Sequence, residues 1–320
     1  GKAGFDVSLS SAINAARSGL QVSSLRAEIV ATNVANATTP GYVRRSVTLS
    51  ETILGGKTVG VRTDGITRVN DTAIKAQRRE LTSDLAQASV LSSTWKSLSA
   101  RIGDTAAGTG LFKNYSDFET ALARSVSTPE SFPAAAGLLE AARGITRELN
   151  GLSEMVEIQR AEADREISDG VKIVNAALKE VQELNTRLAG INRTSGEAAA
   201  LIDERQRVLD TIAEYLPIQT VDRDSGTIDV LTVEGVFLLA GRAREIEFTP
   251  SSAFGPEVSL AGGELSGLSV DGLDLTPGAP AFGAVSGGLF GALFTLRDTD
   301  LPSLSAQLDA IAGDLMGRLS

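Results

Sequence analysis

The apolar residues near the N-terminus are spaced in a way that allows little other than one long helix. From residue 9 they advance by alternating steps of four and three, along a stripe that we call the seam. Its eight positions, seven of them apolar, are Leu9, Ile13, Ala16, Leu20, Ser23, Ala27, Val30 and Val34. Such heptad spacing is typical of a helix that packs lengthwise on a partner. The alternative is an ordinary amphipathic helix of a local domain, although no core-forming segment follows nearby.

A helix of this kind is marginal in water on its own, so its stability depends on what buries its apolar side. We therefore expect the seam to be covered by another segment of the protein or by another subunit.

The predicted helix ends abruptly in the run TTPGY, residues 38–42. The proline disfavours the helical conformation at the preceding threonine, and the glycine permits a tight turn. Residues 40–70 then carry short strand-like runs between glycines and threonines, which predict small β-hairpins or an extended β-arm. We expect Tyr42, Arg44 and Arg45 to begin an arm that contacts neighbouring subunits. An ordinary loop into a local hairpin is the alternative.

Residues 71–216 are expected to form a helical bundle domain. A helix is predicted from about residue 71 to 102, with an apolar stripe along one side. The stripe contains Ile74, Leu81, Leu85, Ala88, Trp95, Leu98 and Ile102. A short helix that ends near residue 126 should begin at a capping box made by Ser116 and Glu119.

A longer helix is predicted to begin at Ser131-Phe132-Pro133, because a serine can cap a helix and a proline fits its first turn. The seam spacing returns further along this helix. Its positions are Ile167, Val171, Val174, Leu178, Val181, Asn185 and Leu188. A turn at 190–196 precedes a helix over 197–215, whose charged run at 203–210 we expect to be a solvated face. The bundle is thus expected to be coiled-coil-like.

Residues 217–285 are expected to form a small outer β domain inserted between helices. Apolar and polar residues alternate there around Asp224-Ser225-Gly226, which predicts a hairpin. Residues 286–320 return to helical spacing and should add a return helix to the helical domain. This spacing is still running at Ser320 without a capping residue, so we expect the helical pattern to continue in a longer chain. The predicted fold class is therefore mainly α with an inserted β domain.

The composition argues against an enzyme. The chain has no histidine and no cysteine, which removes the commonest general base, the commonest metal ligand and thiolate nucleophiles. The GKT at residues 56–58 lacks the spaced glycine of a phosphate-binding loop. Asp222, Asp224 and Asp229 lack the spacing of a calcium loop, so turn chemistry explains them better. We expect no catalytic residue, no cofactor, no metal and no small-molecule substrate.

The formal net charge of −10 argues against binding to nucleic acid or to an acidic membrane surface. No stretch approaches the length of a membrane span, and the N-terminus lacks the apolar region of a cleavable signal. A secreted destination would therefore need another export route.

Two parts of the sequence resemble a known superfamily. The seam helix with Ser18-Gly19-Leu20, followed by residues 33–44, resembles the signature of bacterial flagellar axial proteins of the rod, hook and hook-associated classes. The motif positions are Asn33, Asn36, Thr39, Pro40, Gly41, Tyr42 and Arg44. The long helical middle, the helix over 197–215 with its following hairpin, and residues 286–312 are similar to the hook-associated protein 1 family in particular.

The resemblance implies a structural role. The family implies an axial core-tube helix and extended arm over residues 1–70, whose seam forms the assembly interface by pairing with a C-terminal helix. It also implies helical self-assembly, with the hook protein and a second junction protein adjoining the filament as partners. Export through the flagellar type III apparatus without a cleaved signal, to the extracellular flagellum, and an export chaperone that binds the C-terminal region are implied as well.

Two alternatives stay open. A hook or distal-rod axial subunit would have few long helices between its terminal segments. A secreted enzyme or adhesin would carry its activity on residues 217–285, and a pocket with converging polar side chains there would favour it.

Overall fold

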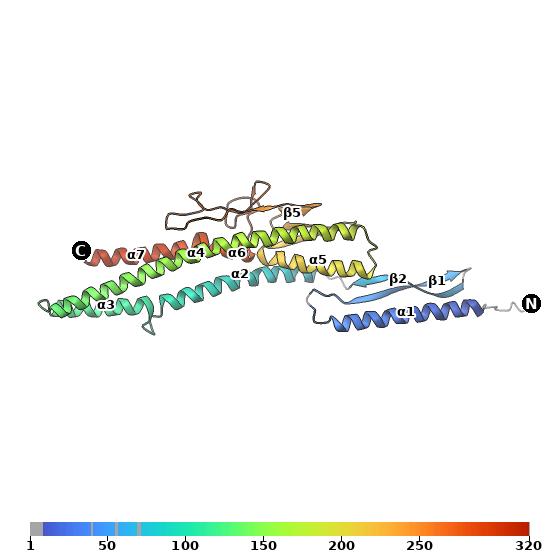
Figure 1. Ribbon diagram of the computed structural model, residues 1–320, viewed down its shortest axis with the longest axis horizontal. Helices are drawn as coiled ribbons and strands as arrows, with labels where there is room; N and C mark the ends of the chain where they lie inside the picture. The colour runs from blue at the N-terminus through green and yellow to red at the C-terminus, as the bar shows by residue number, and fades with distance from the viewer. Residues whose placement is uncertain (1–8, 40, 55–56, 69–71, 320) are drawn as a thin grey trace, which may run out of the picture.

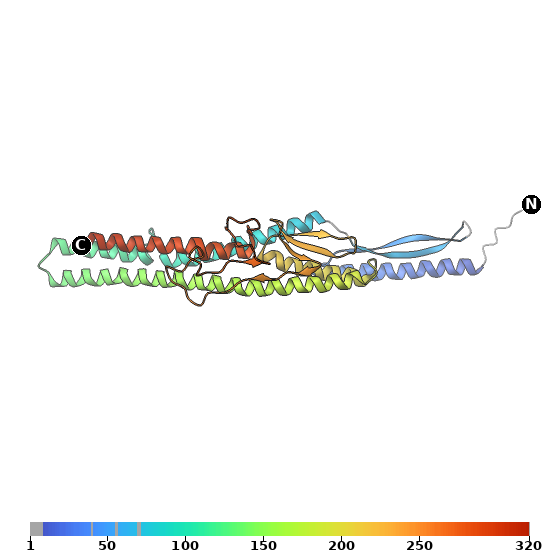
Figure 2. The ribbon, with the colours of Figure 1, turned by 90° about the horizontal axis from the view of Figure 1, so that it is seen from above.

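The computed structural model describes residues 9–39, 41–54, 57–68 and 72–319, and it shows an elongated, mainly helical molecule (Figures 1 and 2). Two parts follow each other along the long axis. The N-terminal unit contains helix α1 (Leu9–Ala35) and an antiparallel hairpin of β1 (Arg45–Leu54) and β2 (Lys57–Arg68). The helical body contains the remaining elements. The predicted fold class, mainly α with small β parts, is confirmed.

The helical body is built around one very long helix. Helix α4 (Phe132–Ala189) has 58 residues and runs beside α3 (Gly110–Ser127), α5 (Gly196–Tyr215) and α7 (Leu301–Leu319). At 1.5 Å per residue α4 is about 87 Å long. Helix α2 (Thr72–Ile102) packs chiefly on α5 and on α6 (Gly288–Thr295). The Ala134 N–H donates to Ser131 Oγ, which confirms the predicted cap. The heptad stripe predicted on α4, from Ile167 to Leu188, is buried at each of its seven positions.

Helix α3 begins six residues before the predicted capping box. It starts at Gly110, and Ser116 lies inside it, so the capping-box prediction was wrong. The reason is tertiary packing, because Leu111 and Phe118 are each 6% exposed against α4 and α7. Burial of Leu111 offsets the poor helix propensity of a glycine at the first position.

The predicted stripe of α2 does not form a single buried face. Ile74, Leu81 and Leu85 are each more than half exposed, whereas Leu98 is 1% exposed. The buried positions in the first half of α2 are polar, and Arg79 there donates to Gln206 Oε1 on α5. The apolar pattern therefore predicted burial of the wrong face over the first half of α2.

Residues 218–274 form the β layer over α4 (Figure 2). One sheet has the order β3 (Ile218–Asp222), β4 (Ile228–Thr232), β5 (Phe237–Ala240), β6 (Arg242–Ala243). A second has the order β7 (Ile246–Glu247), β8 (Ser269–Val270), β9 (Leu273–Asp274). The predicted hairpin turn is confirmed: the Arg223 N–H donates to Thr227 O, and Gly226 has φ +83°.

The β layer and the helices share one apolar core. Its buried residues come from α4, α5, the strands and α6 (Gly288–Thr295), with Ile167, Leu209, Leu238 and Phe290 among the most buried. Gly170 of α4 makes this packing close, because a Cβ there would lie 2.7 Å from the Tyr215 ring. A second core joins α2, α3, α4 and α7 (Leu301–Leu319).

A π-helical turn at Leu296–Asp300 links α6 to α7. The Leu301 N–H donates to Leu296 O, five residues earlier, and Pro302 follows without a donor of its own. The turn places Arg297 in the interior, where it is fully buried. Arg297 Nη1 lies 2.6 Å from Asp164 Oδ1 of α4, and Nη2 donates to Ser266 O of the β layer. This cluster fastens three separate segments together.

Candidate functional site

Helix α1 has an inner face that packs on the hairpin. Val22 and Ile29 on this face are 7% and 8% exposed. The Val61 N–H of β2 donates to Ser18 Oγ over 3.2 Å. Gly60 allows this approach, because a Cβ there would lie 2.7 Å from Ser18 Oγ. The hairpin thus supplies the local partner for one side of α1.

The seam lies on the opposite side of α1 and is exposed. Positions two residues apart on a helix point about 200° apart, so the seam faces away from Val22 and Ile29. The exposed fractions of its large side chains are Leu9 77%, Ile13 58%, Leu20 73%, Val30 60% and Val34 72%. Ala16 and Ala27 on the same stripe are also exposed. The described residues therefore leave an apolar stripe uncovered along the whole length of α1.

Asn33, a motif residue, fixes the path of the chain after α1. Its Oδ1 accepts hydrogen bonds from the Tyr42 hydroxyl at 2.8 Å and from the Arg45 N–H at 2.9 Å. Its Nδ2 donates to Arg45 O at 2.9 Å. One side chain thus ties the start of β1 back to the end of α1.

The other motif residues have smaller parts in the same turn. Asn36 Nδ2 donates to Thr32 O, and Thr39 Oγ1 donates to Asn36 Oδ1. Gly41 has φ +80°, and a Cβ there would clash with Arg207 of α5. Arg44 is exposed. Pro40, the remaining motif residue, lies outside the described residues.

Asp203 on α5 joins the N-terminal unit to the helical body. Its Oδ2 lies 2.8 Å from Arg45 Nη2, and its other oxygen pairs with Arg68 at the end of β2. The Arg45 guanidinium also lies over the Tyr42 ring, 5.1 Å from its centre. A neighbouring contact reinforces this joint, because the Ile66 N–H donates to the Thr194 carbonyl oxygen.

The charged run of α5 was therefore wrongly predicted to be a solvated face. Asp203 is 6% exposed and Arg205 is 5% exposed. Arg205 Nη1 donates to Asn185 Oδ1 and to Gly226 O, which connects α5 to α4 and to the β3–β4 turn. The partners of Asp203 lie 135 and 158 residues away, so no local pattern could have indicated them.

Within one chain, the segment after α1 forms the local hairpin. Tyr42 and Arg45 bond to Asn33 and Asp203 of their own chain. Contact between this segment and neighbouring subunits stays a prediction, and Arg44, which is exposed, is the residue most available for it.

The described residues offer no cluster of three or more acidic side chains placed to hold a metal ion. Among the same residues, no helix is both long and apolar enough to span a membrane. What the described residues do present is a helix with an apolar stripe that none of them covers, joined to the helical body by the ion pairs of Asp203, and such a stripe is suited to binding another helix.

Comparison with known proteins connects this architecture to a family. The family model described as the flagellar hook-associated protein FlgK helical domain matches residues 95–319. Flagellar hook-associated protein 1 of Escherichia coli (strain K12) is 24% identical over 313 residues, which cover 95% of this chain and 55% of that protein. The protein of the same name from Salmonella typhimurium is 26% identical over 255 residues, or 77% of this chain and 45% of that protein.

A solved structure agrees with the fold. The flagellar hook junction protein FlgK from Burkholderia pseudomallei superposes with a TM-score of 0.55 at 17% identity, over 75% of this chain and 41% of that one. At this identity the likeness shows the fold alone. The chain spans about half the length of the curated relatives it matches.

Proposed function

Because the chain belongs to the family of the flagellar hook-associated protein FlgK helical domain, we propose that it serves as a structural subunit that joins the hook to the filament of a bacterial flagellum. The observation that carries this proposal is the seam. Five large apolar side chains on one face of α1 are 58% to 77% exposed, although the opposite face is buried on the hairpin. An apolar stripe of this length is characteristic of a surface that another protein segment covers.

Assembly would proceed through copies of the chain packed head to tail in an open helical array, so each contact joins two different surfaces. The Asp203 joint supports this role, because it holds the seam at a set orientation to the helical body. The hook protein, the second junction protein and an export chaperone are the proposed partners. The proposed destination is the extracellular flagellum, reached through the flagellar type III apparatus without a cleaved signal. The role involves no catalysis.

Deleting the gene in the source organism tests this function. We expect cells whose hooks are present but carry no attached filament, as seen by electron microscopy, because only the junction is lost. Restoring the gene on a plasmid is the control and should restore attached filaments. Cells without hooks would instead identify a hook or distal-rod subunit. Cells with normal attached filaments would contradict every axial role and favour an activity on the β layer.

A further inference from the structure

The end of the β1–β2 hairpin carries two exposed apolar residues, Ile53 and Leu54, which we call the hairpin tip. Strand β1 ends at Leu54, which pairs with Lys57 of β2. Ile53 is 64% exposed and Leu54 is 73% exposed. Neighbouring residues of a strand point to opposite faces, so one apolar side chain projects from each side of the tip. Hairpin turns are usually polar, and burial of this tip by another molecule would be favourable.

An apolar groove lies between α3, α4 and the last turns of α7. It has a volume of about 180 Å³, and its lining includes Phe118, Ile145, Leu149, Leu315 and Met316. The first three of these are buried, whereas Met316 is 67% exposed at the rim. An apolar cavity of about 150 Å³ is known to accommodate benzene, so this groove has room for one leucine or isoleucine side chain.

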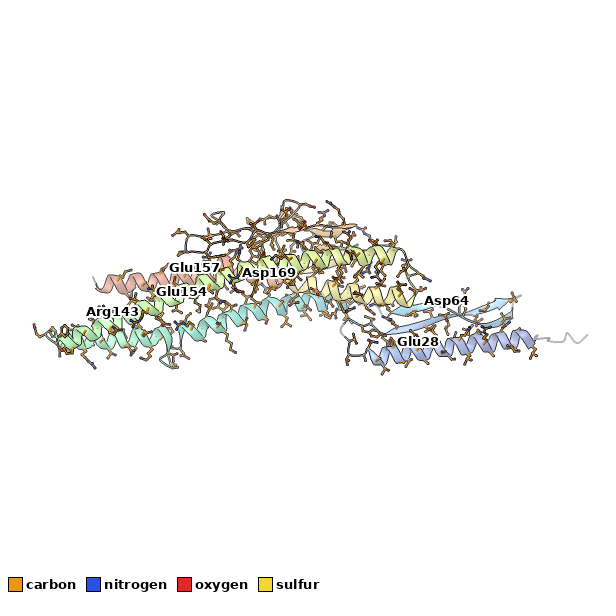
Figure 3. All side chains as sticks on the ribbon, viewed as in Figure 1. Glu28, Asp64, Arg143, Glu154, Glu157 and Asp169 are labelled. Carbon is orange, nitrogen blue, oxygen red and sulfur yellow. The ribbon has the colours of Figure 1, made fainter. Side chains whose placement is uncertain are left out.

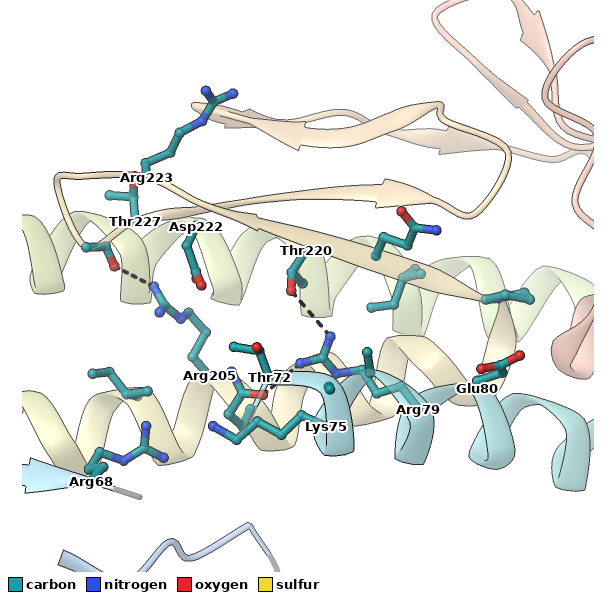
Figure 4. A pocket seen from close by; sticks show the side chains of 18 of the residues that line it. Arg68, Thr72, Lys75, Arg79, Glu80, Arg205, Thr220, Asp222, Arg223 and Thr227 are labelled. Carbon is teal, nitrogen blue, oxygen red and sulfur yellow. Dashed lines mark hydrogen bonds between the residues drawn. The ribbon is translucent and has the colours of Figure 1, made fainter. Parts of the chain in front are cut away.

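A larger opening in the helical body does not match the hairpin tip. It is a trench of about 1090 Å³ between α2, α5 and β3, and Figure 4 shows Arg79, Thr220 and Asp222 around it. Arg79 is also ion-paired with Asp210. An apolar side chain placed there would separate polar groups from water without giving them new partners, which is unfavourable.

The hairpin tip and the groove lie at opposite ends of the long axis, the tip beside α1 and the groove beside the end of α7 (Figures 1 and 2). They cannot meet within one copy of the chain. A contact between them joins two different surfaces of two copies, and its repetition extends an open array.

The two ends also differ in charge. The hairpin segment, residues 41–68, has five cationic and two anionic residues, and its net charge is +2 when Asp203, the partner of Arg45 and Arg68, is counted with it. The end of the helical body that holds the groove, residues 103–160 and 301–319, has six cationic and ten anionic residues, a net charge of −4. These totals include the residues that are ion-paired within each end. The two ends therefore attract each other.

We propose that the hairpin tip of one copy inserts into the groove of a second copy, and that this contact links copies of the chain head to tail. The flexible side chain of Met316 at the rim can adjust to the inserted residue. The proposal rests on the proposed function for the open array, but it uses surfaces other than the seam.

Cysteine cross-linking of the purified chain tests the contact, because the sequence has no cysteine. All proteins carry Leu20→Asp, which removes association through the seam. The variant with both Leu54→Cys and Met316→Cys is concentrated and treated with a mild oxidant. We expect a ladder of disulfide-linked oligomers, since each copy then has one thiol at each end. Both substituted residues are exposed, so the variant should fold, and circular dichroism checks this.

The control pairs Leu54→Cys with Arg242→Cys, an exposed residue of the β layer outside the groove. It should give only the low yield of chance collisions.

Sedimentation velocity of the cysteine-free Leu20→Asp protein measures the affinity. Ile53→Glu and Met316→Glu should each raise the dissociation constant by about tenfold or more, because each places a charge in the apolar contact. Thr48→Glu adds the same charge at an exposed hairpin position about 20 Å from the tip, and it should change the dissociation constant by less than about twofold.

Three results would overturn the proposal. They are a ladder no stronger than that of the Arg242 control, covalent products that stop at the dimer, which indicate a closed antiparallel pair, and unchanged affinity in folded Met316→Glu. Association that Leu20→Asp alone abolishes would also overturn it and would leave the junction role intact. A ladder from a chain whose gene deletion leaves filaments attached would support the contact and contradict the junction role.

Discussion

Replacing Arg297 with methionine is expected to lower the free energy of unfolding by about 3 to 5 kcal/mol, because it leaves a buried carboxylate without its cation. Arg297 is fully buried and Asp164 is 1% exposed. Methionine keeps most of the apolar stem of the arginine, so the lost charge rather than lost volume should dominate. Urea unfolding followed by far-UV circular dichroism measures the change.

An exposed pair provides the matched control. Arg165 pairs with Glu162 on the surface of α4, the helix that also carries Asp164, and the side chain of Arg165 is 62% exposed. Arg165→Met should leave the unfolding midpoint almost unchanged, because surface ion pairs contribute little. The double variant Arg297→Met with Asp164→Leu should recover part of the lost stability, since it removes both charges of the buried pair and leaves only the more exposed Asp298 without its arginine. An unfolding midpoint in Arg297→Met equal to that of the wild type would show that the cluster does not anchor the β layer.

The second large effect concerns assembly. Leu20→Asp in the protein as the cell makes it should abolish the proposed hook–filament joining while the helical body stays folded. Leu20 is 73% exposed in the single chain, so an aspartate there meets water and costs little. In the assembly the same position would be covered, and burying a charge there costs several kcal/mol after relaxation. Losing the leucine contact removes about 1.5 to 3 kcal/mol more.

Gln21→Asp is the control for this experiment. Residue 21 is exposed, lies about 100° around the helix from Leu20, and the substitution changes the net charge by the same amount. It should assemble normally. Filaments attached at wild-type frequency in Leu20→Asp cells would contradict the role given to the seam, provided that circular dichroism shows the variant to be folded.

Local sequence signals predicted much of the fold because they depend on neighbouring residues. Ser131 caps α4, Gly226 makes the β3–β4 turn, and the α4 seam is buried, each through contacts within a few residues or along one face. The long-range polar contacts could not be predicted in this way. Asp203 has the same local surroundings as a solvated acid, yet it is buried by arginines from β1 and β2.

Helix α1 illustrates both a confirmed prediction and a contact that the sequence pattern did not predict. Its spacing predicted α1 and its apolar stripe, and the structure has both. The spacing did not indicate that the opposite face, with Val22 and Ile29, would pack on the hairpin. Glu28 of α1 and Asp64 of the hairpin, both labelled in Figure 3, are exposed charged residues, whereas the seam exposes apolar ones.

The most direct test of the central claim measures whether the seam is covered in the flagellum. The chain has no cysteine, so Ala27→Cys introduces one thiol on the exposed seam with little change in size, and Arg242→Cys places one on the outer β layer. Both thiols should react with a maleimide in the free subunit. In intact flagella the thiol at residue 27 should be protected and the thiol at 242 should still react. Equal labelling of both in intact flagella would contradict the account.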